Sequence, residues 1–174
     1  MKKFTSIILT IATIFAMTTN AFAAQAPYTR EATLRGSVDI KYNGEEQVLQ
    51  DVNGNTVLPI FFDGTHYLPL RALSKLAGLN IAWDAATRTV VLTSGGEVAT
   101  SNTDVQADDT TVTVTVSTDI TVTMDGVAQT FKTEGGETVY PVLYNGTTYL
   151  PVRAVANLVG LNIEWDNTNN AVLI

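Results

Sequence analysis

The chain has 174 residues, a formal net charge of −7 and no cysteine. The acidic balance disfavours nucleic acids and anionic membranes as partners, because like charges repel. Without cysteine there can be no disulfide, thiolate metal site or cysteine nucleophile, so the hydrophobic residues, 45% of the sequence, must stabilise the fold.

Residues 1–23 have the pattern of an export signal. Two lysines precede a mostly apolar run at residues 4–17, and residues 21–23 supply a small-residue cleavage site. The apolar run is shorter than the roughly 20 residues that span a bilayer, although an uncleaved signal anchor is the alternative. We expect cleavage before Ala24, no membrane attachment afterwards, and a mature net charge of 8 − 17 = −9 on a secreted, extracellular or cell-wall-associated protein.

Strands and tight turns are predicted next along the chain. Apolar and polar residues alternate over residues 32–42, which is the period of a strand with one buried face. Asn43-Gly44 and Asp63-Gly64 then predict hairpins, because both positions of such a turn need a positive φ that these residues accept. Another turn is predicted at residues 53–55.

A short helix is predicted after Pro69, which can pre-set the first helical turn. Leucines from Leu70 to Leu76 recur at three-residue spacing on one face, and Gly78 is placed to form a left-handed cap. Residues 80–92 read as a closing hairpin, which completes one unit.

The same elements return 82 residues later. Tyr67 to Asp84 and Tyr149 to Asp166 share the order of Pro, Arg, Gly, Trp and Asp at a constant offset (149 − 67 = 82 and 166 − 84 = 82), and we call residues separated by this offset twins. The sequence therefore predicts an α+β fold of two tandem small units, each an antiparallel β-sheet of hairpins curled around one short α-helix. The first copy is 24–93, the second copy is 110–174, and a flexible acidic linker at 94–109 joins them.

The repeated pattern resembles the copper amine oxidase N-terminal domain-like family, also called stalk domains. It runs from Tyr-Leu-Pro-x-Arg through Leu-x-Gly-Leu-Asn-Ile-x-Trp-Asp to a closing apolar strand, over residues 62–92 and 144–174. The resemblance implies a small sheet about one helix, found in secreted and surface proteins of Gram-positive bacteria, often in tandem and beside cell-wall or hydrolytic modules. In that family the copper and the tyrosine cofactor belong to a different domain. Copper also needs several imidazole ligands, and the chain has only His66, so we expect no enzymatic activity, cofactor or metal.

Two pairs of twins are the main candidate binding residues. Trp83 and Trp165 can offer a sugar-stacking platform or, as the general tendency of Trp favours, cover the core. Arg71 and Arg153 lie near helix starts, where the macrodipole disfavours a cation. Each arginine can contact a ligand carboxylate or sugar. It can instead have an internal role, which we favour, by pairing with Asp84 or Asp166 or by donating hydrogen bonds to loop carbonyls. Adding aromatic area, the candidate surface comprises Trp83, Trp165, Tyr67, Tyr149, Arg71 and Arg153.

The leading hypothesis is a secreted, non-catalytic binding module, with cell-wall polysaccharide or another secreted protein as partner. The alternatives are a structural spacer or self-assembling surface element, which would form a homo-oligomer through exposed strand edges, and an accessory protein of an extracellular hydrolase. His66 is expected to be a surface histidine, and the linker acids Asp104, Asp108 and Asp109 are expected to be solvated. Function is expected where the copies differ, at His66 against Thr148, Lys75 against Asn157, and Ala82 against Glu164.

Overall fold

The structure, a computed structural model, describes residues 25–100 and 107–174. The predicted export signal and Asp104 lie outside the described residues. The first copy contributes β1 (Tyr28–Leu34), β2 (Asp39–Tyr42), β3 (Glu45–Glu46), β4 (Ile60–Phe62), β5 (Thr65–Pro69), α1 (Leu70–Leu76), β6 (Leu79–Asp84) and β7 (Thr89–Ser94). The second copy contributes β8 (Thr110–Val116), β9 (Thr121–Met124), β10 (Val127–Gln129), β11 (Phe131–Lys132), β12 (Thr138–Val139), β13 (Val142–Tyr144), β14 (Thr147–Pro151), α2 (Val152–Val159), β15 (Glu164–Asp166) and β16 (Ala171–Leu173).

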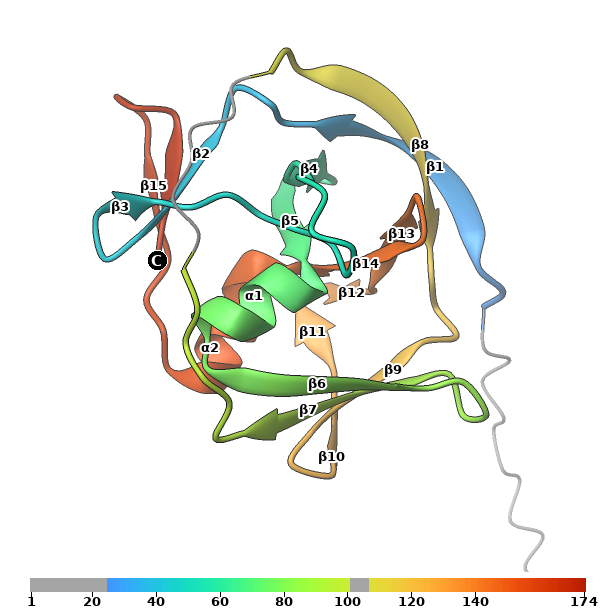
Figure 1. The fold of residues 1–174 in the computed structure, drawn as a ribbon. Helices are drawn as coiled ribbons and strands as arrows, with labels where there is room; N and C mark the ends of the chain where they lie inside the picture. Colours follow the sequence, from blue (N-terminus) through green and yellow to red (C-terminus); the bar gives the residue numbers. More distant parts are fainter. Residues whose placement is uncertain (1–24, 101–106) are drawn as a thin grey trace, which may run out of the picture.

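A closed barrel of strand order β1-β4-β5-β14-β13-β8 takes three strands from each copy. The copies meet along β1 with β8 and along β5 with β14, both antiparallel, and Figure 1 shows the long β1–β8 ribbon on one side. In the first seam Glu31 faces its own twin Thr113, and in the second Leu68 faces its own twin Leu150. A residue can face its own twin only near a twofold axis, so the two copies are related by an approximate twofold axis through both seams.

The two copies also exchange strands outside the barrel. The closing strand β7 of the first copy pairs in parallel with β9 of the second, and the closing strand β16 of the second pairs in parallel with β2 of the first. The predicted mixture of strands and short helices is present, but the expectation that each copy has its own sheet differs from the structure. Sequence periodicity marks which residues form a strand and carries little information about which distant strand lies beside it.

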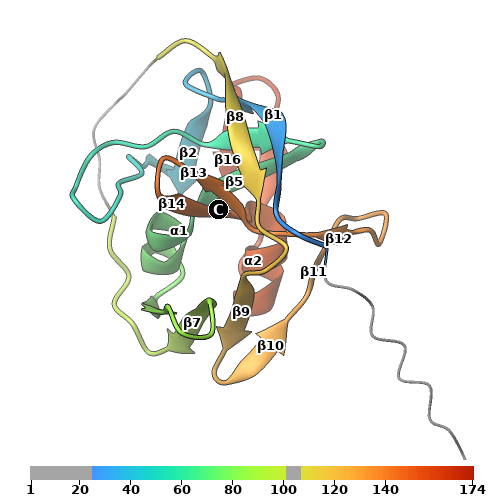
Figure 2. The ribbon, with the colours of Figure 1, turned by 90° about the vertical axis from the view of Figure 1, so that its right-hand side faces the viewer.

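Two hydrophobic clusters form the core, and both draw on both copies. One fills the barrel with Ala32, Ile60, Phe62, Tyr67, Val114, Val116, Val142 and Tyr149. The other packs both helices against the remaining sheets, with Leu70 and Leu73 of α1 in the same cluster as Val152 and Val155 of α2. Figures 1 and 2 show both helices between the barrel and the sheet that contains β7 and β9. Neither copy therefore buries its apolar face alone.

The predicted turns and the predicted helix are confirmed, whereas the strand predicted over residues 32–42 is interrupted between β1 and β2, which belong to different sheets. Both residues of the Asn43-Gly44 and Asp63-Gly64 turns have positive φ, as do those of their twin turns. Helix α1 begins directly after Pro69 and its predicted leucine face is buried, while Gly78 and its twin Gly160 have φ of 62° and 72°. None of the helices in residues 25–100 and 107–174 is long and apolar enough to cross a membrane.

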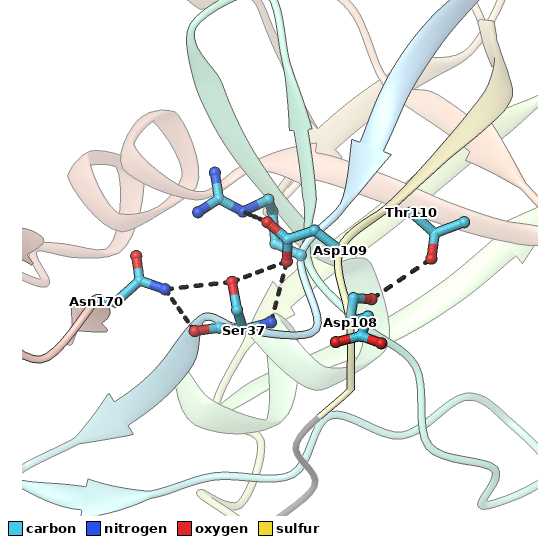
Figure 3. Close-up of polar contacts among 6 residues, drawn as sticks. Ser37, Asp108, Asp109, Thr110 and Asn170 are labelled. Carbon is cyan, nitrogen blue, oxygen red and sulfur yellow. Dashed lines mark hydrogen bonds and ion pairs between the residues drawn. The ribbon is translucent and has the colours of Figure 1, made fainter.

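The end of the linker is hydrogen-bonded to the first copy (Figure 3). The Asp109 carboxylate accepts hydrogen bonds from the Ser37 backbone N–H at 3.1 Å and from Ser37 Oγ at 2.8 Å, and it lies 2.8 Å from Arg35 Nε. Between these partners, Gly36 allows Ala107 to approach closely, because a Cβ there would lie 2.3 Å from the Ala107 carbonyl oxygen. Asp108 and Asp109 are both exposed to solvent, as predicted, but the Asp109 carboxylate also links the start of β8 to the loop between β1 and β2.

Candidate functional site

The two candidate tyrosines lie inside the barrel. Tyr67 and Tyr149 are each 1% exposed, and they face the interior of the barrel together with the other residues of its cluster. Burial raises the pKa of both phenols well above the ordinary value. The prediction that these tyrosines belong to a binding surface is therefore wrong. They alternate with neighbours along β5 and β14, and on a closed barrel one face of every strand points inward.

The repeated aspartates stabilise turns instead of pairing with the arginines. Asp84 accepts hydrogen bonds from Ala86 N at 2.9 Å and Thr87 Oγ1 at 2.8 Å. Its twin Asp166 accepts equivalent bonds from Thr168 N at 2.8 Å and Asn169 Nδ2 at 2.6 Å. These bonds, led by the Thr87 and Asn169 side chains respectively, lower the pKa of both carboxyls. The favoured internal pairing of arginine with these aspartates is therefore wrong.

Trp165 is covered by a hairpin of the other copy. The His66 ring at the start of β5 stacks on Trp165 with a centroid distance of 4.9 Å and an interplanar angle of 18°. The ring of Phe61 in β4 also contacts His66, in a tilted arrangement with a centroid distance of 5.0 Å. The indole Nε1 of Trp165 donates to Asn167 Oδ1 at 2.8 Å. This tryptophan is half-buried against the helix-containing core, as the sequence predicted.

His66 is not the surface histidine that the sequence predicted. Its Nε2 is buried and has no hydrogen-bond partner in the described part of the chain. Burial, with smaller contributions from the nearby Arg35 and Arg153 charges, lowers the pKa of His66 to about 4. The neutral imidazole therefore serves as a flat cover for Trp165 near neutral pH.

Trp83 stands in a different environment. It is 49% exposed, although its general tendency predicted a core position. It borders a hollow of about 400 Å³ that β6 of the first copy and the β13–β14 hairpin of the second copy enclose, together with the loop at residues 50–52. Thr148, the twin of His66, lines this hollow and has no ring to place over the indole.

The two candidate arginines also differ. Arg153 pairs through Nη1 with Glu134 Oε1. Arg71 lines the hollow beside Trp83, and no hydrogen bond or ion pair to its guanidinium is found within residues 25–100 and 107–174. The twin of Glu134 is Val52 (134 − 52 = 82), which is 72% exposed and lines the same hollow. The first copy thus lacks the carboxylate that pairs with the arginine in the second.

Each tryptophan and three further residues therefore define two comparable surfaces. We call Arg71, Trp83, Val52 and Thr148 the first rim, and their twins Arg153, Trp165, Glu134 and His66 the second rim. A hollow of about 350 Å³ beside the second rim is lined by Glu134 and Arg153 but not by Trp165. The first rim is thus the one that offers an open aromatic face together with a guanidinium.

Sequence reasoning found some of the differences between twins at and around the rims. It singled out Thr148 against His66 and Ala82, which also lines the first hollow, against Glu164. It missed Val52 against Glu134, because this position lies in a turn-rich stretch outside the dense motif. A systematic comparison of twins for changes of charge would have found it.

The acidic side chains of the described residues form no metal-binding cluster. No set of three or more His, Cys, Asp or Glu side chains that could hold a metal ion occurs in the part of the chain that the structure describes. Asp51, the acidic residue of the first hollow, accepts hydrogen bonds from Asn53 N at 2.8 Å and from Asn55 N at 2.9 Å, which hold its turn. The arrangement favours recognition of a ligand.

The copper amine oxidase N-terminal domain family model matches residues 43–174. Because the match covers most of the chain, the chain belongs to this family, and the matched domain is not the catalytic domain of the oxidase. The match is a single one and does not divide the chain into two copies. No curated protein and no solved structure gave a significant match.

Proposed function

We propose that the protein is an exported, non-catalytic binding module that acts at the cell surface, with cell-wall polysaccharide or another secreted protein as its partner. The observation that carries the proposal is the hollow of about 400 Å³ beside Trp83, a residue that is 49% exposed. Pockets for small ligands or ligand groups are concave, mostly apolar, and contain a few polar groups that fix orientation. Membership of a non-catalytic domain family gives further support.

The test is retention on purified peptidoglycan and on immobilised secreted proteins. We expect the mature protein to bind one of the two, and Trp83→Ala to lose that binding. Val127→Ala is the matched control, because Val127 is 64% exposed and lies outside the lining of the first hollow. Absence of binding to both materials would remove the proposal. Mass spectrometry of the exported chain tests the localisation, and a mature N-terminus at Ala24 is expected.

A second candidate function is self-assembly. The barrel has no open edge, but β6 is the outer strand of the sheet β10-β9-β7-β6, and its residues from Ala82 to Asp84 are exposed. An unpaired strand edge can accept a strand from another molecule. Light scattering during size-exclusion chromatography over a range of concentrations tests this candidate, and a mass that stays monomeric throughout would eliminate it.

A further inference from the structure

We propose that the first rim binds a carboxylate-bearing saccharide, whose ring stacks on Trp83 and whose carboxylate pairs with Arg71. This inference deepens the proposed binding function and rests on it. The second rim is the internal reference, because it shows what the same backbone does when the tryptophan and the arginine are both occupied by the protein's own side chains.

The position of the carboxylate follows from the arginine pair. In the second rim Glu134 contacts Arg153, so a carboxylate reaches this guanidinium from the twin position of Val52. In the first rim Val52 leaves that position without an anion. A guanidinium prefers a carboxylate because its planar donors match the two oxygens. A ligand carboxylate can therefore take the place in the first rim that Glu134 occupies in the second.

The position of the ring follows from the tryptophan pair. His66 covers the Trp165 face at 4.9 Å, nearly parallel to it. Thr148 stands at the twin position in the first rim, and Leu143 stands where Phe61 supports the histidine. Trp83, which is 49% exposed, can thus receive the C–H face of a saccharide ring where the imidazole lies on Trp165. An exposed indole stacks on such rings through its large apolar surface.

The rest of the hollow favours a saccharide over an apolar molecule. Its volume of about 400 Å³ suits a small ligand or one or two rings of a longer chain. Gln50, Thr147 and Thr148 add amide and hydroxyl groups that can exchange hydrogen bonds with sugar hydroxyls. Arg88 also lines the hollow but pairs with Asp119 at 2.8 Å, which leaves the Arg71 guanidinium for a ligand carboxylate.

The direct test measures binding of tri-galacturonic acid and of its methyl ester by calorimetry and by tryptophan fluorescence. The two probes share their rings and differ in charge. We expect the acid to bind with one site per chain. The ester should bind at least about tenfold more weakly, because it cannot form the charge-assisted contact with the guanidinium. Arg71→Gln and Trp83→Ala should each weaken binding of the acid by at least about tenfold, while the twin variant Arg153→Gln leaves it unchanged.

Two variants that keep Arg71 and Trp83 make the test sharper. Val52→Glu introduces the carboxylate of the second rim, and Thr148→His introduces its ring, so each should abolish binding of the acid. Both changes place the twin's own residue at its position, and circular dichroism checks that the fold is kept. In the opposite direction, the triple variant Phe61→Leu, His66→Thr, Glu134→Val should raise the stoichiometry towards two sites per chain.

Several outcomes would overturn the ligand class. Equal binding of acid and ester, full binding by Arg71→Gln, or full binding by Val52→Glu would each remove the carboxylate contact. Binding of an acetylated peptide that ends in a free carboxylate, without binding of the saccharide, would assign the rim to a peptide. If tri-galacturonic acid fails while Trp83-dependent retention on peptidoglycan or secreted proteins persists, the ligand class is wrong and the binding function stands. Failure of both experiments removes both proposals.

Discussion

The first rim and the second rim share a backbone, a tryptophan and an arginine, yet the environments of these two side chains are opposite. In the second rim His66 covers Trp165, and Glu134 pairs with Arg153. In the first rim Trp83 is 49% exposed and Arg71 lies beside a hollow of about 400 Å³. Tryptophan and arginine thus stand at twin positions in the two rims, and the residues around them differ in whether they cover these side chains.

Substitutions in the shared core and substitutions at the two rims should have different effects. Both copies contribute residues to the core, in the barrel and in the helix-containing cluster. Changes in the core should affect both copies together, whereas changes at the rims should affect one copy only. Four predictions test this contrast, from the largest expected effect to the smallest.

The largest effect is expected from separating the copies. A chain of residues 24–93 keeps β1, β4 and β5 but loses β8, β13 and β14, half of the barrel. We expect it to show no cooperative unfolding as a monomer by circular dichroism. Because the copies are related by a twofold axis, association of two such chains is the one route to a closed barrel. A monomer with a cooperative transition would contradict the shared core.

The next effect is expected at the axis itself. Leu150 is fully buried and faces its twin Leu68 across the seam between β5 and β14. Leu150→Ala should lower the free energy of unfolding by about 2–5 kcal/mol, and Leu68→Ala by a similar amount, because each leaves a cavity in the same place. Urea unfolding measures both. Val52→Ala is the exposed control and should change the free energy by no more than about 0.5 kcal/mol.

A smaller effect is expected at the repeated turns. Asp84→Ala and Asp166→Ala each remove hydrogen bonds that hold a turn between two strands. Each should lower the Tm by a few degrees at neutral pH. The folded-state pKa of each carboxyl is depressed below 3.8. Its contribution to stability is therefore present above pH 3.8 and is lost as the pH falls through the folded-state pKa. Equal Tm values for variant and wild type at neutral pH would show that other contacts hold these turns.

The smallest effect is expected at His66, which makes stability depend on pH at the second rim but has no counterpart in the first rim. Its folded pKa of about 4 lies below the ordinary value of 6.5, so the unfolded chain binds more protons between these values. The stability from neutral His66 is therefore complete above pH 6.5 and declines as pH falls towards 4. His66→Thr, which places the twin's residue, should reduce the drop in Tm across this window. An unchanged drop would show that His66 does not sense pH through burial.

The candidate site was only partly predictable from the sequence. Repeated Trp and Arg residues pointed to Trp83 and Arg71 of the first hollow, and twin differences pointed to Thr148. The expectations for Tyr67 and Tyr149, for Trp83, for His66 and for the pairing of Arg71 failed. The two tyrosines lie inside a barrel that needs strands from both copies, and the surroundings of Trp83 and His66 depend on segments of the other copy. Within the described part of the chain, Arg71 has no internal partner because Val52, in its own copy, replaces the glutamate that pairs with Arg153.

The sequence by itself determined the local structure: where strands alternate, where Asn-Gly and Asp-Gly turns reverse the chain, and where a helix begins after Pro69 and ends at Gly78. These features follow from the φ preferences and periodicity of neighbouring residues. Only the tertiary structure decided that β7 pairs with β9, that β16 pairs with β2, and that one barrel serves both copies. Strand partners are chosen by burial of apolar faces contributed by distant segments, and with twin strands of nearly equal pattern, pairing within a copy and pairing between copies look alike in the sequence.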